Sequence, residues 1–319
     1  MTKKMVDLYL APKRRDLEDL VWYKCLTAMQ FVDDRVGWAV GSAQIVRTTN
    51  AGRTWRNLFD GSMVQLAFAP KKLWAPTKDT CWIIDTIGLG KTRCLFTVDG
   101  GQTWLPLELD SSQYPRDIFF FNSQRGWLVC DNGTIEGGVP AISSTTNSGQ
   151  TWQSQQLNIE GRPEIIRFLD HKYGWLVERI LTNAQTESVS RLHRSTNGGE
   201  TWDFVTAFDD HILDLRIRDH KRIFVCGESG LIASSHNGGL KWRRLKTKTG
   251  VAINFVALGS NQTLVAGGDF GCLLLSRDEG ETWRPLHVPD SDANYVGAYV
   301  LSDGKLIVCS SISISYVDI

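Results

Sequence analysis

The side chains that could carry acid–base or metal chemistry are six histidines and a set of carboxylates in the middle of the chain. The histidines, at positions 171, 193, 211, 220, 236 and 287, show no H-x-x-x-H or other metal-ligand spacing. Glycoside hydrolysis needs two facing carboxylates, and candidates occur at Asp117, Glu136, Glu164, Glu178 and Asp214. Spacing alone brings no two of them together. The sequence therefore predicts no metal site and no cofactor, and it leaves open whether the protein is an enzyme while favouring a non-catalytic one.

Arginines and nearby aromatic or imidazole groups could instead support binding. The planar guanidinium pairs with carboxylates and backbone carbonyls and stacks on aromatic rings, which suits contacts with a protein partner. The alternative is that these arginines are ordinary solvated surface residues, and both interpretations stay open. The candidate binding residues are Arg93, Tyr114, Arg116, Arg162, Arg167, Arg179, Arg191 and His211.

Composition excludes several classes of partner and location. The 319 residues carry 35 basic and 35 acidic side chains, so the broad basic field of nucleic-acid-binding proteins is missing. No apolar run approaches the roughly 20 residues of a membrane span. The first residues lack the apolar core and cleavage site of a signal peptide. The seven cysteines contain no C-x-x-C pair and predict reduced thiols, so we expect a cytoplasmic protein.

A repeated eight-residue pattern shows which elements position these side chains. It reads Ser or Thr, any residue, Asp or Asn, any residue, Gly, any residue, Thr, Trp, and only Lys241 departs from it. Its six tryptophans are 49, 48, 50, 40 and 41 residues apart. The Asp or Asn side chain can accept backbone N–H bonds in a tight turn, and the glycine supplies a positive φ. The acidic or amide residues are therefore predicted to be structural, not metal ligands: Asn50, Asp99, Asn147, Asn197, Asn237 and Asp278.

A second repeat precedes these turns and defines the folding unit. It comprises an apolar run, a turn and a strand that opens with Gly-Trp, as at Gly37-Trp38 and Gly126-Trp127. Phe224 and Leu264 are expected to take the tryptophan position in later copies. Each copy thus predicts four short strands over 40–50 residues, which is typical of a β-propeller blade.

The turn pattern resembles the Asp-box, or bacterial neuraminidase repeat. Combined with the F-x-x-x-x-x-GW-x-V strand, it resembles the photosystem II stability/assembly factor family of cyanobacteria and plastids. The resemblance covers about residues 27–290 and implies a seven-bladed propeller. In that family, an arginine-rich patch on one face is associated with contacts to partner proteins. Sialidases, sortilin-type receptors and xyloglucan-cleaving hydrolases share the box, so the motif specifies the fold more strongly than the function.

We therefore predict an all-β protein made of one seven-bladed propeller with four-stranded antiparallel blades. Residues 27–290 form six blades, and residues 291–319 supply three strands of the last one. The N-terminal 1–26 contain a strand, Val6 to Leu10, that joins the last blade and closes the ring, and a connector. Closure would remove the open sheet edges. Six blades with decorated ends is the alternative.

This geometry predicts where function lies. The Asp turns share one face, and the connections between second and third strands and between blades share the other. We expect longer loops on the latter face around 85–93, 131–141 and 178–191, and loops on a rigid scaffold commonly carry function. The predicted function is a non-catalytic binding or assembly module for a protein or peptide. The alternative is a divergent propeller enzyme acting on a glycan or small molecule at the channel mouth, although the Arg-Ile-Pro-like segment of sialidases does not occur.

Overall fold

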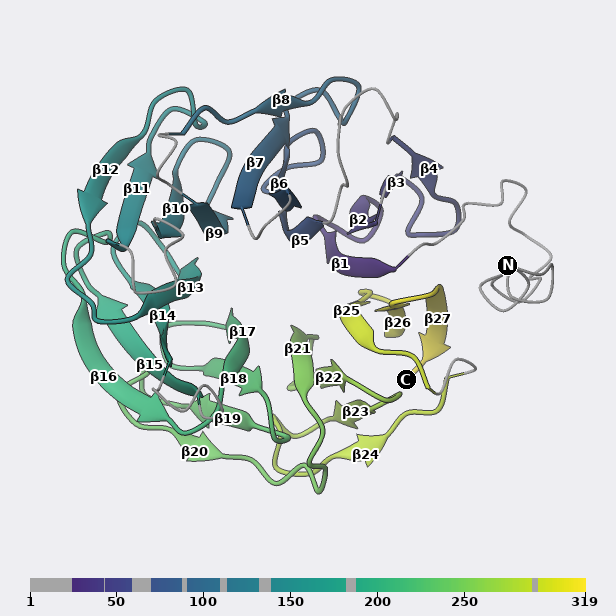
Figure 1. Ribbon diagram of the computed structural model, residues 1–319. Helices are drawn as coiled ribbons and strands as arrows, with labels where there is room; N and C mark the ends of the chain where they lie inside the picture. Colours follow the sequence, from purple (N-terminus) through teal and green to yellow (C-terminus); the bar gives the residue numbers. More distant parts are fainter. Residues whose placement is uncertain are drawn as a thin grey trace, which may run out of the picture.

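Seven antiparallel sheets surround a central channel in the computed structural model (Figure 1). It describes residues 25–42, 44–58, 70–87, 91–109, 114–131, 139–181, 188–288 and 292–319. Within these residues, six sheets have four strands and one has three. The prediction of a seven-bladed propeller is confirmed, and the six-bladed alternative is wrong. The expected closing strand from Val6 to Leu10 lies outside the described residues.

Blades 1 to 4 follow each other along the chain, each with its first strand next to the channel (Figure 1). The strands of blades 1 and 2 are β1 (Leu26–Phe31), β2 (Gly37–Gly41), β3 (Gln44–Thr48), β4 (Arg56–Asn57), β5 (Pro70–Trp74), β6 (Cys81–Ile87), β7 (Lys91–Thr97) and β8 (Leu105–Pro106). Those of blades 3 and 4 are β9 (Tyr114–Phe120), β10 (Gly126–Asp131), β11 (Ala141–Thr145), β12 (Gln153–Gln156), β13 (Arg162–Phe168), β14 (Gly174–Leu181), β15 (Ser188–Ser195) and β16 (Asp203–Phe208).

Blades 5 to 7 complete the ring and bring the last blade beside the first (Figure 1). Their strands are β17 (Ile212–Ile217), β18 (Ile223–Gly227), β19 (Ile232–Ser235), β20 (Arg243–Arg244), β21 (Ile253–Leu258), β22 (Leu264–Gly268), β23 (Leu273–Ser276), β24 (Arg284–Pro285), β25 (Tyr295–Val300), β26 (Lys305–Ser310) and β27 (Ile314–Asp318). The N–H of Leu26 donates to the carbonyl of Ser311 at 3.0 Å. This bond ties blade 1 to blade 7.

The six repeated turns share one hydrogen-bond scheme between the third and fourth strands. In blade 3, the N–H of Gly149 donates to the hydroxyl of Thr145 at 3.0 Å, and Oδ1 of Asn147 accepts the N–H of Thr151 at 3.0 Å. The same two bonds occur in the other five turns. Lys241 makes its bond through the backbone, from its N–H to Asn237 at 2.8 Å. That is why this position accepts lysine in place of threonine.

Tryptophan packing between neighbouring blades forms the core. Trp38, Trp82, Trp127 and Trp175 are at most 1% exposed. Trp82 of blade 2 meets the turn tryptophan Trp152 of blade 3 edge-on, with ring centroids 6.1 Å apart. Trp38 and Trp104 repeat this contact between blades 1 and 2 at 6.2 Å. The hydrophobic clusters therefore lie between blades, where aromatic pairs add stability beyond their buried area.

Glycine is required in the turns of blades 3 and 5 for two reasons: the backbone has a positive φ, and a tryptophan of the preceding blade lies too close for a side chain. Gly149 has a φ of +79°, and a Cβ there would lie 2.6 Å from Cη2 of Trp82 in the preceding blade. Gly239 likewise approaches Trp175, with 2.5 Å to Nε1. A side chain at either position would separate two blades as well as strain the turn.

We expect Gly149→Ala to lower the free energy of unfolding by about 2–5 kcal/mol. A Cβ in left-handed backbone costs roughly 1–2 kcal/mol, and overpacking against Trp82 adds about 1–3 kcal/mol. Urea unfolding measures the change. Gly304→Ala is the matched control, because Gly304 has a φ of +83° and no heavy atom within 4 Å of its Cβ position. Equal losses in the two variants would show that contact with the preceding blade does not matter.

Candidate binding face and central channel

A β-bulge interrupts the pairing of the first and second strands in all seven blades. Each bulge lies near the start of the inner strand, on the face opposite the Asp turns, which we call the loop face. Bulges redirect side chains at the rims of β-structures. The chain thus places seven re-aimed side chains around one mouth of the channel: Thr27, Lys71, Arg116, Glu164, Leu213, Asn254 and Val296.

Two of these bulges begin an ion-pair network between blades 3 and 4. Nε and Nη2 of Arg116 donate to the two carboxylate oxygens of Asp131 at 2.7 and 3.0 Å. Arg162 lies 3.9 Å from the same carboxylate and donates through Nε to Glu164 at 2.7 Å. The Asp131 side chain is only 7% exposed, whereas those of Arg116 and Arg162 are 17% and 30% exposed. A buried carboxylate therefore orients two more accessible guanidinium groups.

The network continues through Arg179 towards blade 5. Arg179 pairs with Arg162 in the register of β13 and β14 and makes no ion pair with the described residues. Nδ1 of His211 lies 3.5 Å from Glu228. Burial, followed by the nearby positive charge of Arg179, lowers the pKa of His211, although Glu164 and Glu228 oppose this effect. The group has a net positive charge, because its three arginines outnumber its two carboxylates: Arg116, Arg162, Arg179, Asp131 and Glu164.

Arg93 and Arg191 form ion pairs separate from this network. Arg93 stands opposite Asp85 in the β6–β7 register and donates to its fully buried carboxylate at 2.7 and 3.0 Å. Arg191 on β15 pairs with the exposed Glu160 at 2.7 Å. The described ends of the expected loops 85–93 and 178–191 are strand, and Arg93, Arg179 and Arg191 all lie in paired strands. Residues 88–90, 132–138 and 182–187 lie outside the described residues.

Arg167 does not join this network. Its guanidinium lies against the buried Asp117 and 5.2 Å above the ring of Trp74, in the wall of the channel. Asp117 also accepts the N–H of Ile166 across the blade boundary at 2.9 Å. Tyr114 is half-buried at the start of β9, opposite Asp131 in the register. Of the predicted binding residues, Arg167 therefore lies apart in the channel wall. The structure brings five others together: Tyr114, Arg116, Arg162, Arg179 and His211.

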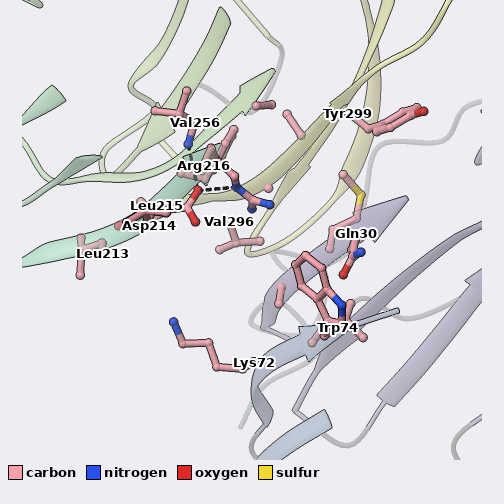
Figure 2. A pocket seen from close by; sticks show the side chains of 18 of the residues that line it. Gln30, Lys72, Trp74, Leu213, Asp214, Leu215, Arg216, Val256, Val296 and Tyr299 are labelled. Atoms are coloured by element: carbon pink, nitrogen blue, oxygen red, sulfur yellow. Dashed lines mark hydrogen bonds and ion pairs between the residues drawn. The ribbon is translucent and has the colours of Figure 1, made fainter. Parts of the chain in front are cut away.

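The channel encloses a cavity of about 510 Å³ lined by the inner strands of all seven blades. Asp214 in its wall accepts Nε of Arg216 at 2.8 Å and the N–H of Val256 at 3.2 Å (Figure 2). Lys72 extends into the cavity (Figure 2) and makes no ion pair or hydrogen bond with the described residues. In the channel, Asp214 therefore holds neighbouring blades together, whereas the ammonium group of Lys72 is available to a ligand.

Sequence reasoning missed the acidic half of the network and Lys72. Asp131 and Glu228 each end or follow a second strand, but nothing in the pattern paired them with an arginine or histidine from another strand. Glu164 was considered only as a catalytic candidate. Opposed positions across a predicted hairpin, such as Asp85 and Arg93, are the signal that could have identified part of this arrangement.

No group of three or more metal-ligating side chains gathers in the part of the chain that the structure describes. The same residues form no helix that is long and apolar enough to cross a bilayer. The candidate site is thus built from ion pairs and one rim of the channel.

Comparison with known proteins identifies the family of this propeller. The sequence model of the Photosynthesis system II assembly factor YCF48 family matches residues 144–311, more than half of the 319 residues. The chain belongs to this family. The matched segment runs from the Asp turn of blade 3 to blade 7, so it includes Arg162 and Glu164 of the ion-pair network but not Arg116 and Asp131. No curated protein matches the chain in a sequence comparison.

Solved structures share the fold at low sequence identity. A structure described as "YCF48 bound to D1 peptide" has a TM-score of 0.70 and 19% identity, covering 94% of both chains. YCF48 from Cyanidioschyzon merolae has a TM-score of 0.67 and 18% identity, covering 92% of this chain and 95% of its own. An ancestral GH74 enzyme has a TM-score of 0.69 and 10% identity, covering 92% of this chain but 44% of its own. These likenesses concern the fold.

The depressed pKa of His211 predicts a pH-dependent stability. Because the folded state binds this proton more weakly than the unfolded chain, stability is lost as the pH falls through about 6.5. We expect the wild type to lose more stability than His211→Asn between about pH 8 and pH 5. Denaturant unfolding across this range measures the difference, and NMR titration of His211 should show a higher pKa in Arg179→Gln. A pKa for His211 above the ordinary value would contradict the assignment.

Proposed function

We propose that this protein is a non-catalytic binding or assembly module that presents the loop face of a rigid propeller to a protein or peptide. The observation that carries the proposal is the network of Arg116, Asp131, Arg162 and Glu164 at the channel mouth. Membership of the assembly-factor family supports it. So does the solved family structure described as bound to a D1 peptide.

The network suits recognition of acidic side chains and backbone carbonyls. Asp131 occupies Nε and Nη2 of Arg116, while Nη1 makes no hydrogen bond with the described residues. Arg179 adds a cation without a carboxylate partner in the same residues. Guanidinium groups held by a buried carboxylate lose little side-chain freedom on binding, which favours affinity. The partner surface expected from this charge balance carries carboxylates.

The channel supports the enzyme alternative less well. Asp117, Glu178 and Asp214 are buried, and each accepts hydrogen bonds that hold the propeller together. Glu178 bonds His193 at 2.7 Å and the N–H of Gly161. Although burial raises the pKa of Glu178, the bonds from His193 and Gly161 hold it below its ordinary value. A general acid at neutral pH requires the opposite shift. Glu136 lies outside the described residues.

Removing the two paired arginines tests the proposal. We expect Arg116→Gln/Arg162→Gln to weaken binding of a D1 peptide at least about tenfold, because one charge-assisted contact contributes about 1.4 kcal/mol or more. Isothermal titration calorimetry measures the affinity. Arg243→Gln is the matched control, because Arg243 also pairs with a glutamate, Glu281, but near the Asp turns.

Folding is checked separately, since the variant removes both arginines from the buried carboxylate of Asp131. Arg116→Lys/Arg162→Lys keeps the charges but loses the bidentate fork, so we expect an intermediate affinity. An affinity equal to that of the wild type in both double variants, with folding intact, would refute the proposed binding face.

We further propose that the protein works in a reducing compartment, the cytoplasm. All seven cysteines are free, and five of them are buried. Burial raises the pKa of Cys130 to about 12 and that of Cys81 and Cys226 well above the ordinary value, which makes these thiols unreactive packing groups. We expect a carboxy-terminal fluorescent fusion to distribute through the cytoplasm. Enrichment of the fusion in a membrane-enclosed compartment would contradict this location.

A further inference from the structure

One hairpin on the loop face holds an aromatic side chain in an unfavourable position. The connection between β22 and β23 is a turn from Asp269 to Cys272, closed by the Cys272 N–H donating to the Asp269 carbonyl at 3.0 Å. Its central residues, Phe270 and Gly271, have φ values of 51° and 71°. A two-residue turn with both φ values positive normally carries Asn-Gly or Asp-Gly. A bulky side chain with this backbone is an outlier.

The Phe270 ring is also exposed to solvent. Its exposed fraction of 79% is the highest among the large hydrophobic side chains of the described residues, ahead of Phe204 and Leu240 at 59% each. Phe270 therefore gains neither a favourable backbone conformation nor burial of its ring. A strained residue that the fold does not require is a candidate for function.

The neighbouring blade shows that this turn does not need phenylalanine. In blade 5, the equivalent turn runs from Glu228 to Leu231, with Ser229 and Gly230 at φ values of 53° and 69°. The Leu231 N–H donates to the Glu228 carbonyl at 2.9 Å, as in blade 6. The same backbone is thus built around a serine.

Hydrogen bonds fix Phe270 in place. Its N–H donates to Oδ1 of Asn294 at 3.1 Å, and the N–H of Gly271 donates to the carbonyl of Ala293 at 3.0 Å. The side chain of Asp269 accepts Nδ2 of Asn254 at 2.9 Å. Asn254 lines the channel, so the exposed ring lies on a rigid support beside the channel mouth.

The turn is continuous with the proposed binding face. The charges of Arg179 and Glu164 act on His211, and Nδ1 of His211 lies 3.5 Å from Glu228, the first residue of the equivalent turn in blade 5. The turn of Phe270 is the next one along the ring. Aromatic residues and arginines are both enriched in protein–protein interfaces.

We propose that Phe270 is the apolar anchor of the loop face, and that its ring packs against an apolar side chain of the partner. This inference rests on the proposed function and adds an apolar side chain to the features expected of the partner. The partner segment carries carboxylates for the arginines of blades 3 and 4 and an apolar side chain for blade 6. In this arrangement the segment passes over the channel mouth.

Replacing Phe270 by asparagine separates stability from binding. Phe270→Asn creates the preferred Asn-Gly turn, so we expect a higher melting temperature. We also expect at least a tenfold weaker affinity for the peptide used to test the proposed function. Ser229→Asn is the matched control: it should raise the melting temperature through the same turn and leave the affinity within twofold of the wild type. Phe270→Tyr keeps the ring and should bind like the wild type.

The outcomes distinguish the anchor from the arginine site. Wild-type affinity in Phe270→Asn, together with weakened Arg116→Gln/Arg162→Gln, would overturn the anchor and leave the proposed function standing. No binding by the wild type would count against both. Sedimentation of the free protein provides a further check. A concentration-dependent dimer that Phe270→Asn abolishes would mean that a second copy of the chain covers the ring, and would also overturn the proposal.

Discussion

The propeller depends on the contact between a turn glycine and the tryptophan of the preceding blade. Trp82 touches the backbone of Gly149 so closely that no side chain fits there, and Trp152 then covers its edge. One turn thus serves two purposes: its hydrogen bonds set the hairpin, and its missing side chain sets the distance between blades. The contact recurs between Gly101 and Trp38, Gly199 and Trp127, and Gly239 and Trp175, so blades 1 to 5 support one another, as in other repeat architectures in which neighbouring units share a core.

Because the Asp turns hold the blades together, the face that carries them differs from the opposite face. The Asp turns are committed to packing and to hydrogen bonds with the neighbouring hairpin, such as Ser148 N–H to the Gln124 carbonyl at 2.9 Å. At the bulged starts of the inner strands, Thr27 and Asn254 donate to carbonyls of the next blade, those of Pro70 and Tyr295, but the residue type at the bulge is not fixed. The side chains there vary from Thr27 and Lys71 to Arg116 and Val296. A bulge of constant geometry with variable side chains is suited to building a recognition surface on a fixed frame.

The parts of the fold that could be predicted are those that a local pattern encodes. The eight-residue turn carries its own hydrogen-bond donors, acceptors and positive φ, so the blades and their number followed from sequence. Register was less accessible: Leu264 was expected in the tryptophan position, but β22 pairing places Val265 there, opposite Leu275 as Trp38 is opposite Arg47. The site was harder still, because nothing along the chain shows which carboxylate Arg116 or Arg167 meets. Their surroundings, Asp131 on the rim and Asp117 in the channel wall, depend on contacts between strands and blades.

Buried carboxylates in the channel wall and at the channel mouth explain how a rigid ring can contain charged side chains. Asp117 and Asp214 each join an arginine of the channel wall to a backbone N–H of the following blade. One oxygen of each carboxylate accepts both an arginine and a backbone N–H, so each buried negative charge is paired and hydrogen-bonded. Asp131 is different, because it is shared by Arg116 and Arg162 from two blades and uses no more than part of their donors. At the channel mouth, by contrast, some guanidinium donors of Arg116 and Arg162 have no partner among the residues that the structure describes. Fixed and incompletely paired cations are the feature that distinguishes a recognition surface from a structural ion pair.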